Sequence, residues 1–151
     1  MKAIIDNIKT ELDDKVSALN YVDENWGQLD AYSPNFPVKW PCALIDISEA
    51  SFSNLGMDKS ATPVHRQMAD FSVEIRLANL KLTNSSTRAP KSQRDAAASI
   101  WDIVEDVHKH LQGFAPGANA SKLIRGGMSR VQRDDGVQEY VIVYTSSLHN
   151  C

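Results

Sequence analysis

The sequence predicts an α+β domain in which two amphipathic helices pack on one face of an antiparallel, or mixed, sheet of about four to five strands. Two segments, residues 4–19 and 96–111, repeat their apolar residues with the period of a helix. A strand-like alternation of apolar and polar residues runs over residues 69–77. Residues 123–147 have the pattern of two strands joined by a turn.

The first predicted helix carries one apolar stripe with polar residues around the rest of its circumference, which is typical of a helix docked on a core. Asn20 is expected to end it, and an extended segment begins at Tyr21. Residues 23–39 then form an irregular stretch with two prolines, which predicts a loop with at most a short edge strand. The stripe consists of Ile4, Ile5, Ile8, Leu12, Val16 and Leu19.

Two strands are predicted in the middle of the chain. Residues 41–47 are a short apolar run headed by proline, and residues 69–77 alternate cleanly between one apolar and one polar face. Residues 48–63 are polar and contain Gly56, so we interpret them as a long connecting arm. The two strands are expected to pair as an antiparallel ribbon.

The second helix is predicted to begin after Ser92, which with Asp95 three residues later has the spacing of a capping box. Gly113 is the expected C-cap. Its apolar face is predicted to contain Ala96, Ala97, Ile100, Trp101, Ile103, Val104, Val107 and Leu111.

The last two strands are predicted to form a hairpin closed by a two-residue turn at Asp135 and Gly136, with a bulge at the glycine pair 126–127. The return strand, residues 137–147, is apolar on both faces. Such a strand is central in its sheet, or one of its faces is covered by another subunit.

Composition agrees with one globular domain over residues 1–151, since 42% of the residues are hydrophobic and 23% are charged. A net charge of −3 argues against a general nucleic-acid binder, which would carry a basic excess. No signal peptide and no membrane span are expected. Cys42 is interpreted as a buried small hydrophobe and Cys151 as a thiol in a mobile tail.

No constellation for catalysis, cofactor or metal binding is predicted. His108 and His110 point to different sides of a helix, because a helical metal pair needs the spacing i, i+4. A nuclease core would need an acidic residue followed by Glu-x-Lys, which Asp46 and the segment 74–76 match poorly because Arg76 stands in place of the lysine.

The candidate functional residues are therefore interface residues. Aromatic residues concentrate in the loop 26–40, where they either reach a partner or cover the core. Basic residues concentrate on the last hairpin, where they either meet an acidic neighbour or discourage edge aggregation. The candidates are Trp26, Tyr32, Phe36, Trp40, Phe52, Arg125, Arg130 and Arg133.

The layout of the chain resembles bacteriophage tail-terminator and tail-completion (minor tail) proteins. The resemblance rests on the segments KAIIDNI at 2–8, PCALI at 41–45, DFSVEI at 70–75 and YVIVY at 140–144, with an alanine-rich second helix between the last two. It covers nearly the whole chain through order and spacing, and it carries over no residue-level motif.

The resemblance implies a structural, non-enzymatic subunit that closes into a homo-oligomeric ring, typically a hexamer, on the tail tube. Its partners would be the tube and the head–tail connector, with DNA only passing through the lumen. It would be made in the bacterial host cytoplasm and end in the virion tail of a phage or prophage. Two alternatives are a small ligand-binding module or enzyme with a pocket under the 48–63 arm, and a metal-dependent nuclease using Glu74.

Overall fold

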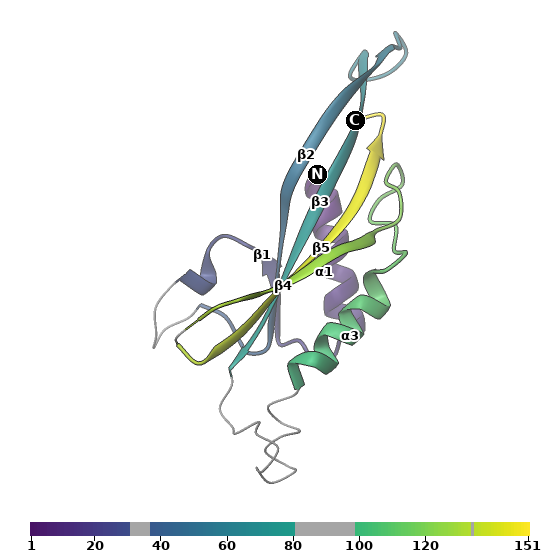
Figure 1. Ribbon diagram of the computed structural model, residues 1–151. Coiled ribbons are helices and arrows are strands. Elements are labelled where there is room, and N and C mark those ends of the chain that lie inside the picture. The colour runs from purple at the N-terminus through teal and green to yellow at the C-terminus, as the bar shows by residue number, and fades with distance from the viewer. Residues whose placement is uncertain (31–36, 81–98, 134) are drawn as a thin grey trace.

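A computed structural model describes residues 1–30, 37–80, 99–133 and 135–151. Figure 1 shows a sheet of long, twisted strands with two helices against it. The elements in chain order are α1 (Lys2–Lys15), β1 (Tyr21–Glu24), the short 3₁₀ helix η1 (Gln28–Asp30), β2 (Cys42–Met57), β3 (His65–Leu80), α3 (Ser99–Leu111), β4 (Ile124–Val131) and β5 (Val137–His149).

The sheet confirms the predicted α+β class and is mixed. Its five strands lie in the order β1-β2-β3-β5-β4. Only β1 pairs in parallel, with β2, while the three other pairs are antiparallel. Strand β5 is therefore central, as its two apolar faces predict.

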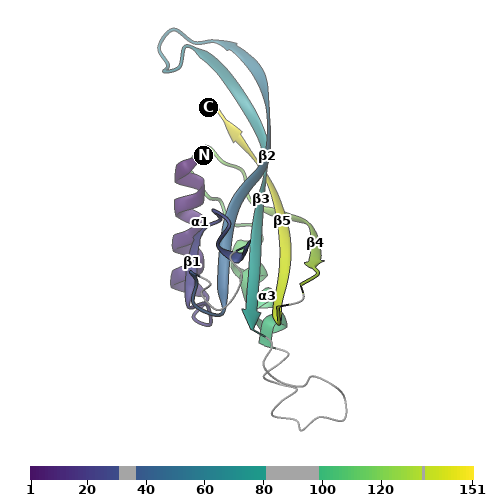
Figure 2. The same cartoon turned by 90° about the vertical axis from the view of Figure 1, so that its left-hand side faces the viewer.

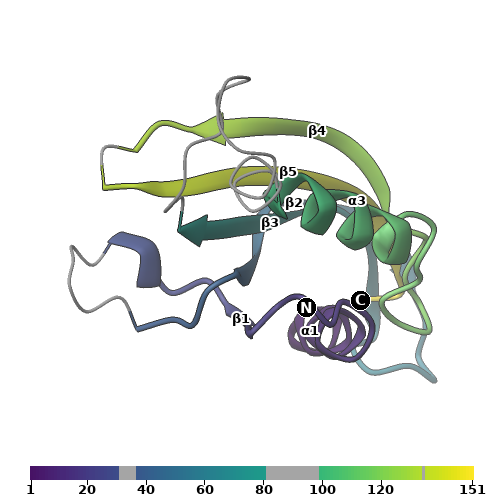
Figure 3. The same cartoon turned by 90° about the horizontal axis from the view of Figure 1, so that it is seen from below.

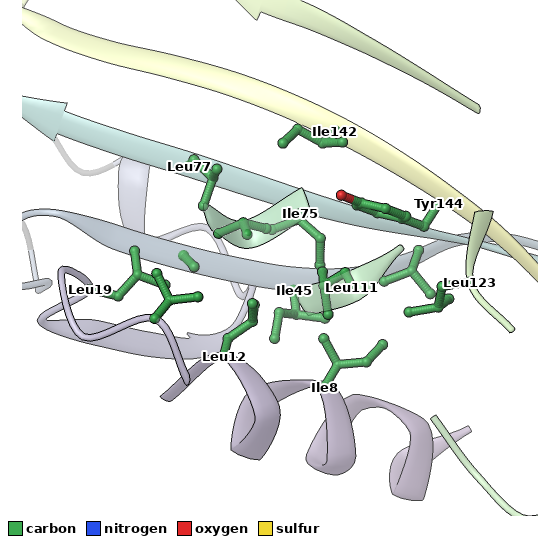
Figure 4. Packing of buried hydrophobic residues seen from close by; sticks show 14 of the residues in the cluster. Ile8, Leu12, Leu19, Ile45, Ile75, Leu77, Leu111, Leu123, Ile142 and Tyr144 are labelled. Atoms are coloured by element: carbon green, nitrogen blue, oxygen red, sulfur yellow. The ribbon is translucent and has the colours of Figure 1, made fainter. Parts of the chain in front are cut away.

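Both helices cover the same face of the sheet and lie next to one another, as predicted (Figure 3). The main core lies between them and the sheet. Figure 4 shows Ile8 and Leu12 of α1 meeting Ile45 of β2 and Ile75 of β3, all of them fully buried. Tyr144 of β5 is also fully buried and closes this core near Leu123.

Helix α1 ends at Lys15, earlier than the predicted stop at Asn20. Val16 and Leu19 remain buried in the core although they lie beyond the helix. After the helix, Asn20 bonds to the segment before β2. Its backbone N–H donates to the carbonyl of Pro41 at 2.9 Å, and its side chain donates to the carbonyl of Trp40 at 2.7 Å.

Helix α3 ends at Leu111, and Gly113, the predicted C-cap, follows two residues later with a φ of +79° that favours glycine. The predicted cap residues Ser92 and Asp95, with Ala96 and Ala97, lie outside the described residues. Trp101 differs from its prediction: it is 46% exposed at the edge of the apolar stripe, where it packs against Tyr140 with ring centroids 4.8 Å apart.

The interpretation of residues 48–63 as a connecting arm without regular structure is wrong for most of that segment. Strands β2 and β3 pair over 16 residues each, and only residues 58–64 connect them. Backbone groups make the bonds of a β-ladder, so polar side chains do not prevent it. Ala50 and Phe52 lie on the same side as Ile47, but the register shift between Ile47 and Glu49 interrupts the alternation in the sequence.

The last hairpin has the predicted bulge, because the register of β4 against β5 shifts between Arg125 and Gly127. Its connection is longer than the predicted two-residue turn. Strand β4 ends at Val131 and β5 begins at Val137, so residues 132–136 join them, of which residue 134 is not described. The reason is an ion-pair cluster around Arg133 in this connection, described below.

Cys42 is fully buried, as predicted, whereas Cys151 does not lie in a free tail. The backbone N–H of Cys151 donates to the carbonyl of Gln67 at 3.1 Å, and that of Gln67 donates back at 3.3 Å. No helix in the described part of the chain is long and apolar enough to cross a membrane.

The core predicts a large loss of stability when one of its buried side chains is truncated. Leu12→Ala should lower the free energy of unfolding by about 2–5 kcal/mol, because the side chain is fully buried between α1 and the sheet. Urea denaturation measures the change. Asp13→Ala, on the exposed side of the same helix, is the control and should stay within about 0.5 kcal/mol of the wild type. Equal losses in the two variants would contradict this packing.

Candidate functional site

The outer half of the β2–β3 hairpin projects beyond the helices (Figures 1 and 2), and it is two-stranded only past Met68, where the pairing of β3 with β5 ends. We call residues 48–66 the arm. Two register shifts lie along its β2 side, between Ile47 and Glu49 and between Asn54 and Gly56. Bulges of this kind bend a ribbon and increase its twist, and Figure 2 shows the arm curving to one side.

The arm exposes large apolar side chains that the rest of the described chain does not cover. Phe52 is 54% exposed, Leu55 51%, Met57 63% and Val64 39%. Single exposed apolar residues are ordinary on a surface, but four on one projecting hairpin are a concentration that points to an interaction site. Of these, the sequence identified only Phe52.

Strand β4 forms one edge of the sheet, and its side chains from Ile124 to Arg130 are exposed. Residues 112–114 cover the start of its outer side: Gly113 N–H donates to the Leu123 carbonyl at 2.8 Å, and the side-chain oxygen of Gln112 accepts from Arg125 N–H at 2.9 Å. Among the described residues, none pairs with the outer side from Gly127 to Val131.

The predicted basic residues of the last hairpin have different surroundings. Arg125 and Arg130 are exposed on β4, on the helix side of the sheet with their register partners Tyr144 and Tyr140. Arg133 is instead turned into the protein, with its side chain only 13% exposed.

Arg133 organises a cluster of charges on the sheet face opposite the helices. Its guanidinium lies 2.7 Å from a carboxylate oxygen of Asp135 and 3.1 Å from one of Glu139, and it donates to the carbonyl of Leu29 at 2.6 Å. Glu139, with its side chain 1% exposed, also accepts from Arg76 at 3.1 Å. The sequence analysis missed this cluster, because its members come from β3, β5 and two connections far apart in the sequence.

The same cluster holds η1 against the sheet through the bond from Arg133 to the Leu29 carbonyl. Leu29 of η1 and the half-buried Trp40 pack with Cys42, Leu44 and Val137 in a second, smaller core on this face. For Trp40, the interpretation that loop aromatics cover the core is therefore confirmed. Trp26 is 63% exposed, and Tyr32 and Phe36 lie outside the described residues.

A polar cavity of about 310 Å³ lies beside the charge cluster. It lies at the loop end of the sheet, away from the arm, and not under residues 48–63, where the ligand-binding alternative would place it. One nitrogen of the Arg76 guanidinium, Nε, is buried and has no hydrogen-bond partner among the described residues. The lining residues are Asn25, Gly27, Leu29, Asp30, Asp46, Arg76 and Glu139.

The residues that the sequence analysis weighed as metal ligands or nuclease residues lie on β2, β3 and α3. Asp46 and Glu74 are register partners on neighbouring strands, and Arg76 follows on the same face. His108 Nδ1 lies 3.2 Å from the Tyr144 hydroxyl, and burial together with the charge of Arg125 lowers the pKa of His108. Within the described residues, no three His, Cys, Asp or Glu side chains are grouped so that they could hold a metal ion.

Cys42 is poorly placed to act as a nucleophile, because burial raises the pKa of its thiol to about 12. The thiolate is the reactive form of cysteine, and at neutral pH this group is protonated.

No protein-family model and no curated protein sequence matches the chain. One solved structure similar to it is a chain from the virion of a native gene transfer agent particle, at 10% sequence identity and a TM-score of 0.44, covering 95% of this chain and 84% of that one. At these values the likeness establishes neither a shared fold nor a shared function.

The buried ion pairs predict that loss of the negative charge of Glu139 strongly destabilises the fold. Glu139→Gln should lower the free energy of unfolding by about 3–5 kcal/mol, because it leaves two arginines without their shared carboxylate. Lys2→Ala removes a salt bridge whose lysine side chain is 92% exposed, and should cost no more than about 0.5 kcal/mol. Urea denaturation of both variants checks the contrast, and a small loss for Glu139→Gln would show that the cluster does not fasten the fold.

The charge cluster around Arg133 also predicts that the stability of the protein depends on pH. The hydrogen bonds from Arg133 lower the pKa of Asp135 below its ordinary value of 3.8. The stabilisation is therefore fully present above that value and is lost as the pH falls through the lowered pKa. The stability gap between wild type and Asp135→Asn should be wide near neutral pH and narrow in acid. In an Arg133→Met background, urea midpoints across the same pH range should show no such change in the gap, and an unchanged dependence there would contradict the assignment to Arg133.

Proposed function

We propose that this chain, as a single domain over residues 1–151, is a structural subunit of a phage or prophage particle and not an enzyme. In particular, we propose a tail-terminator or tail-completion role in the virion tail, where copies close into a ring, typically a hexamer. The ring would end the tail tube and offer a surface to the head connector. The observation that carries the proposal is the arm.

The arm fits assembly better than it fits a catalytic role. A two-stranded ribbon that leaves the body of the sheet exposes backbone edges and apolar side chains at a cost in solubility. Phe52, Leu55 and Met57, each more than half exposed, gain nothing from this position in an isolated chain. A neighbouring subunit that buries them would recover the free energy of apolar burial.

The order of elements in the sequence supports the same proposal through its resemblance to tail-terminator proteins. The exposed Trp26, Arg125 and Arg130 stay candidate interface residues, since each is open to a partner. Arg133 and Trp40 have their main contacts inside the chain, so we assign them to the support of that surface.

Native mass spectrometry and light scattering of the purified chain test the proposal. A ring-sized oligomer should form as the protein concentration rises. The double variant Phe52→Ser with Leu55→Ser should weaken the oligomer roughly tenfold or more, because truncating buried anchors at an interface costs 2 kcal/mol or more. Its urea stability should match the wild type, since both side chains are exposed.

Ser51→Ala on the same strand is the matched control, because it changes the arm without removing apolar area. It should assemble like the wild type. A wild-type chain that stays monomeric at high concentration, alone and with tail tubes added, would overturn the assembly role.

A further inference from the structure

The helix side of β4 carries an exposed patch of aromatic, apolar and basic side chains. Arg130 is the register partner of Tyr140, and the ring centroid of Tyr140 lies 4.8 Å from that of Trp101. Met128 and Arg125 lie on the same side of β4. Trp101 is 46% exposed and Met128 44%, and both arginines are exposed as well. We call Trp101, Arg125, Met128, Arg130 and Tyr140 the aromatic–basic patch.

The composition of this patch is typical of a protein-binding surface, because Trp, Tyr and Arg are the residues that most often carry the binding energy of an interface. The guanidinium groups of Arg125 and Arg130 form no ion pair with any described residue. Glu105, one helical turn after Trp101, pairs with neither of them. The patch therefore presents two unpaired positive charges beside exposed apolar area, and its partner should be negatively charged.

The face of the sheet away from the helices carries that negative charge. Asp46 of β2 and Glu74 of β3 are register partners on this face, since the neighbouring Val73 points into the main core. Glu49 and Asp70 follow on the same face toward the arm, and both are exposed. Within the described chain, none of these four carboxylates forms an ion pair. We call Asp46, Glu49, Asp70 and Glu74 the acidic band.

The basic residues near the acidic band do not neutralise it. Arg76 is ion-paired with Glu139 at 3.1 Å, and Arg66, farther out on the arm, donates to a backbone carbonyl at the end of the chain at 2.8 Å. Lys122 lines the same cavity as Asp70 and offsets part of the charge. The band keeps an excess of negative charge at neutral pH.

The patch and the band face opposite sides of one sheet, so they do not meet within one chain. Two copies placed with the helix side of one against the far face of the next bring them together. Opposite charges favour this encounter, whereas like charges oppose contact of patch with patch or of band with band. A second copy of the chain therefore supplies the negative surface that the patch requires.

We propose that the aromatic–basic patch of one copy binds the acidic band of a second copy. Glu49 belongs to the arm as well as to the band, so this contact includes the base of the arm. A contact between two different surfaces of the same chain is head-to-tail, and it closes into a ring where the rotation between copies allows. The inference rests on the proposed ring assembly and names the two surfaces that make it.

Charge reversal in two separate preparations of the full chain tests the contact. One preparation carries Arg125→Glu with Arg130→Glu, and the other carries Glu49→Lys with Asp70→Lys. Each alone would place like charges across the contact, so each should assemble roughly tenfold more weakly than the wild type or worse, as measured by light scattering. All four side chains are exposed, so both variants should keep the urea midpoint of the wild type.

Mixing the two preparations restores opposite charges at every contact, because the reversed patch of one chain meets the reversed band of the other. Native mass spectrometry should then show oligomers with equal numbers of the two chains. The control is Asp13→Lys with Asp14→Lys, on the exposed side of α1. It should assemble like the wild type, and its mixture with the patch variant should give no oligomers with equal numbers of the two chains.

The outcomes separate the two proposals. If wild-type rings form and either reversed variant assembles as well as the wild type, the contact is wrong while the ring assembly stands. If both variants are weakened and their mixture is not restored, the patch and the band do not face one another and the inference is overturned. If the wild type forms no oligomer, alone or with tail tubes, both proposals fail.

Discussion

The antiparallel pairing of β2 with β3 is the constraint on which the rest of the structure depends. Their ladder continues, with two register shifts, through two different environments. In the inner half, Ile45 and Ile75 are fully buried under the helices, and in the outer half most side chains are exposed. The ladder persists because backbone groups supply its hydrogen bonds, so the ribbon can leave the core without losing them. The arm and its exposed apolar residues follow from this continuation.

The face of the sheet away from the helices combines a small apolar core with a buried, paired carboxylate. Strand β5 is apolar on both sides, and the chain covers part of the second side itself, with Leu29 of η1, Val38 and Trp40. Glu139 is buried there, and a buried carboxylate is tolerated only when it is paired. Arg76 and Arg133 supply the pairing, and Arg133 also holds the carbonyl of Leu29. The charge cluster therefore holds η1 against the sheet, and the stability of this arrangement depends strongly on each charged residue of the cluster.

The β2–β3 ladder and the charge cluster show which residues stabilise the fold and which residues stay exposed to a partner. Arg133 and Trp40 are engaged inside the chain, whereas Phe52, Arg125 and Arg130 remain open. An assembly subunit needs a rigid body and complementary outer surfaces more than it needs a reactive pocket. The described chain offers a packed two-helix core and a projecting arm with exposed apolar side chains, and that combination is the physical basis for proposing assembly.

The sequence by itself determined the elements whose side chains have one clear environment. The stripe of α1, the alternation of β3, the central position of β5 and the bulge beside Gly127 could all be predicted, because periodicity records which face is buried. Only the tertiary structure decided that residues 48–57 are strand, since a ribbon exposed on both faces leaves no periodic signal of burial. It also decided the role of Arg133, because a charged residue in a turn shows its partners only when Leu29, Asp135 and Glu139 are brought together by the fold.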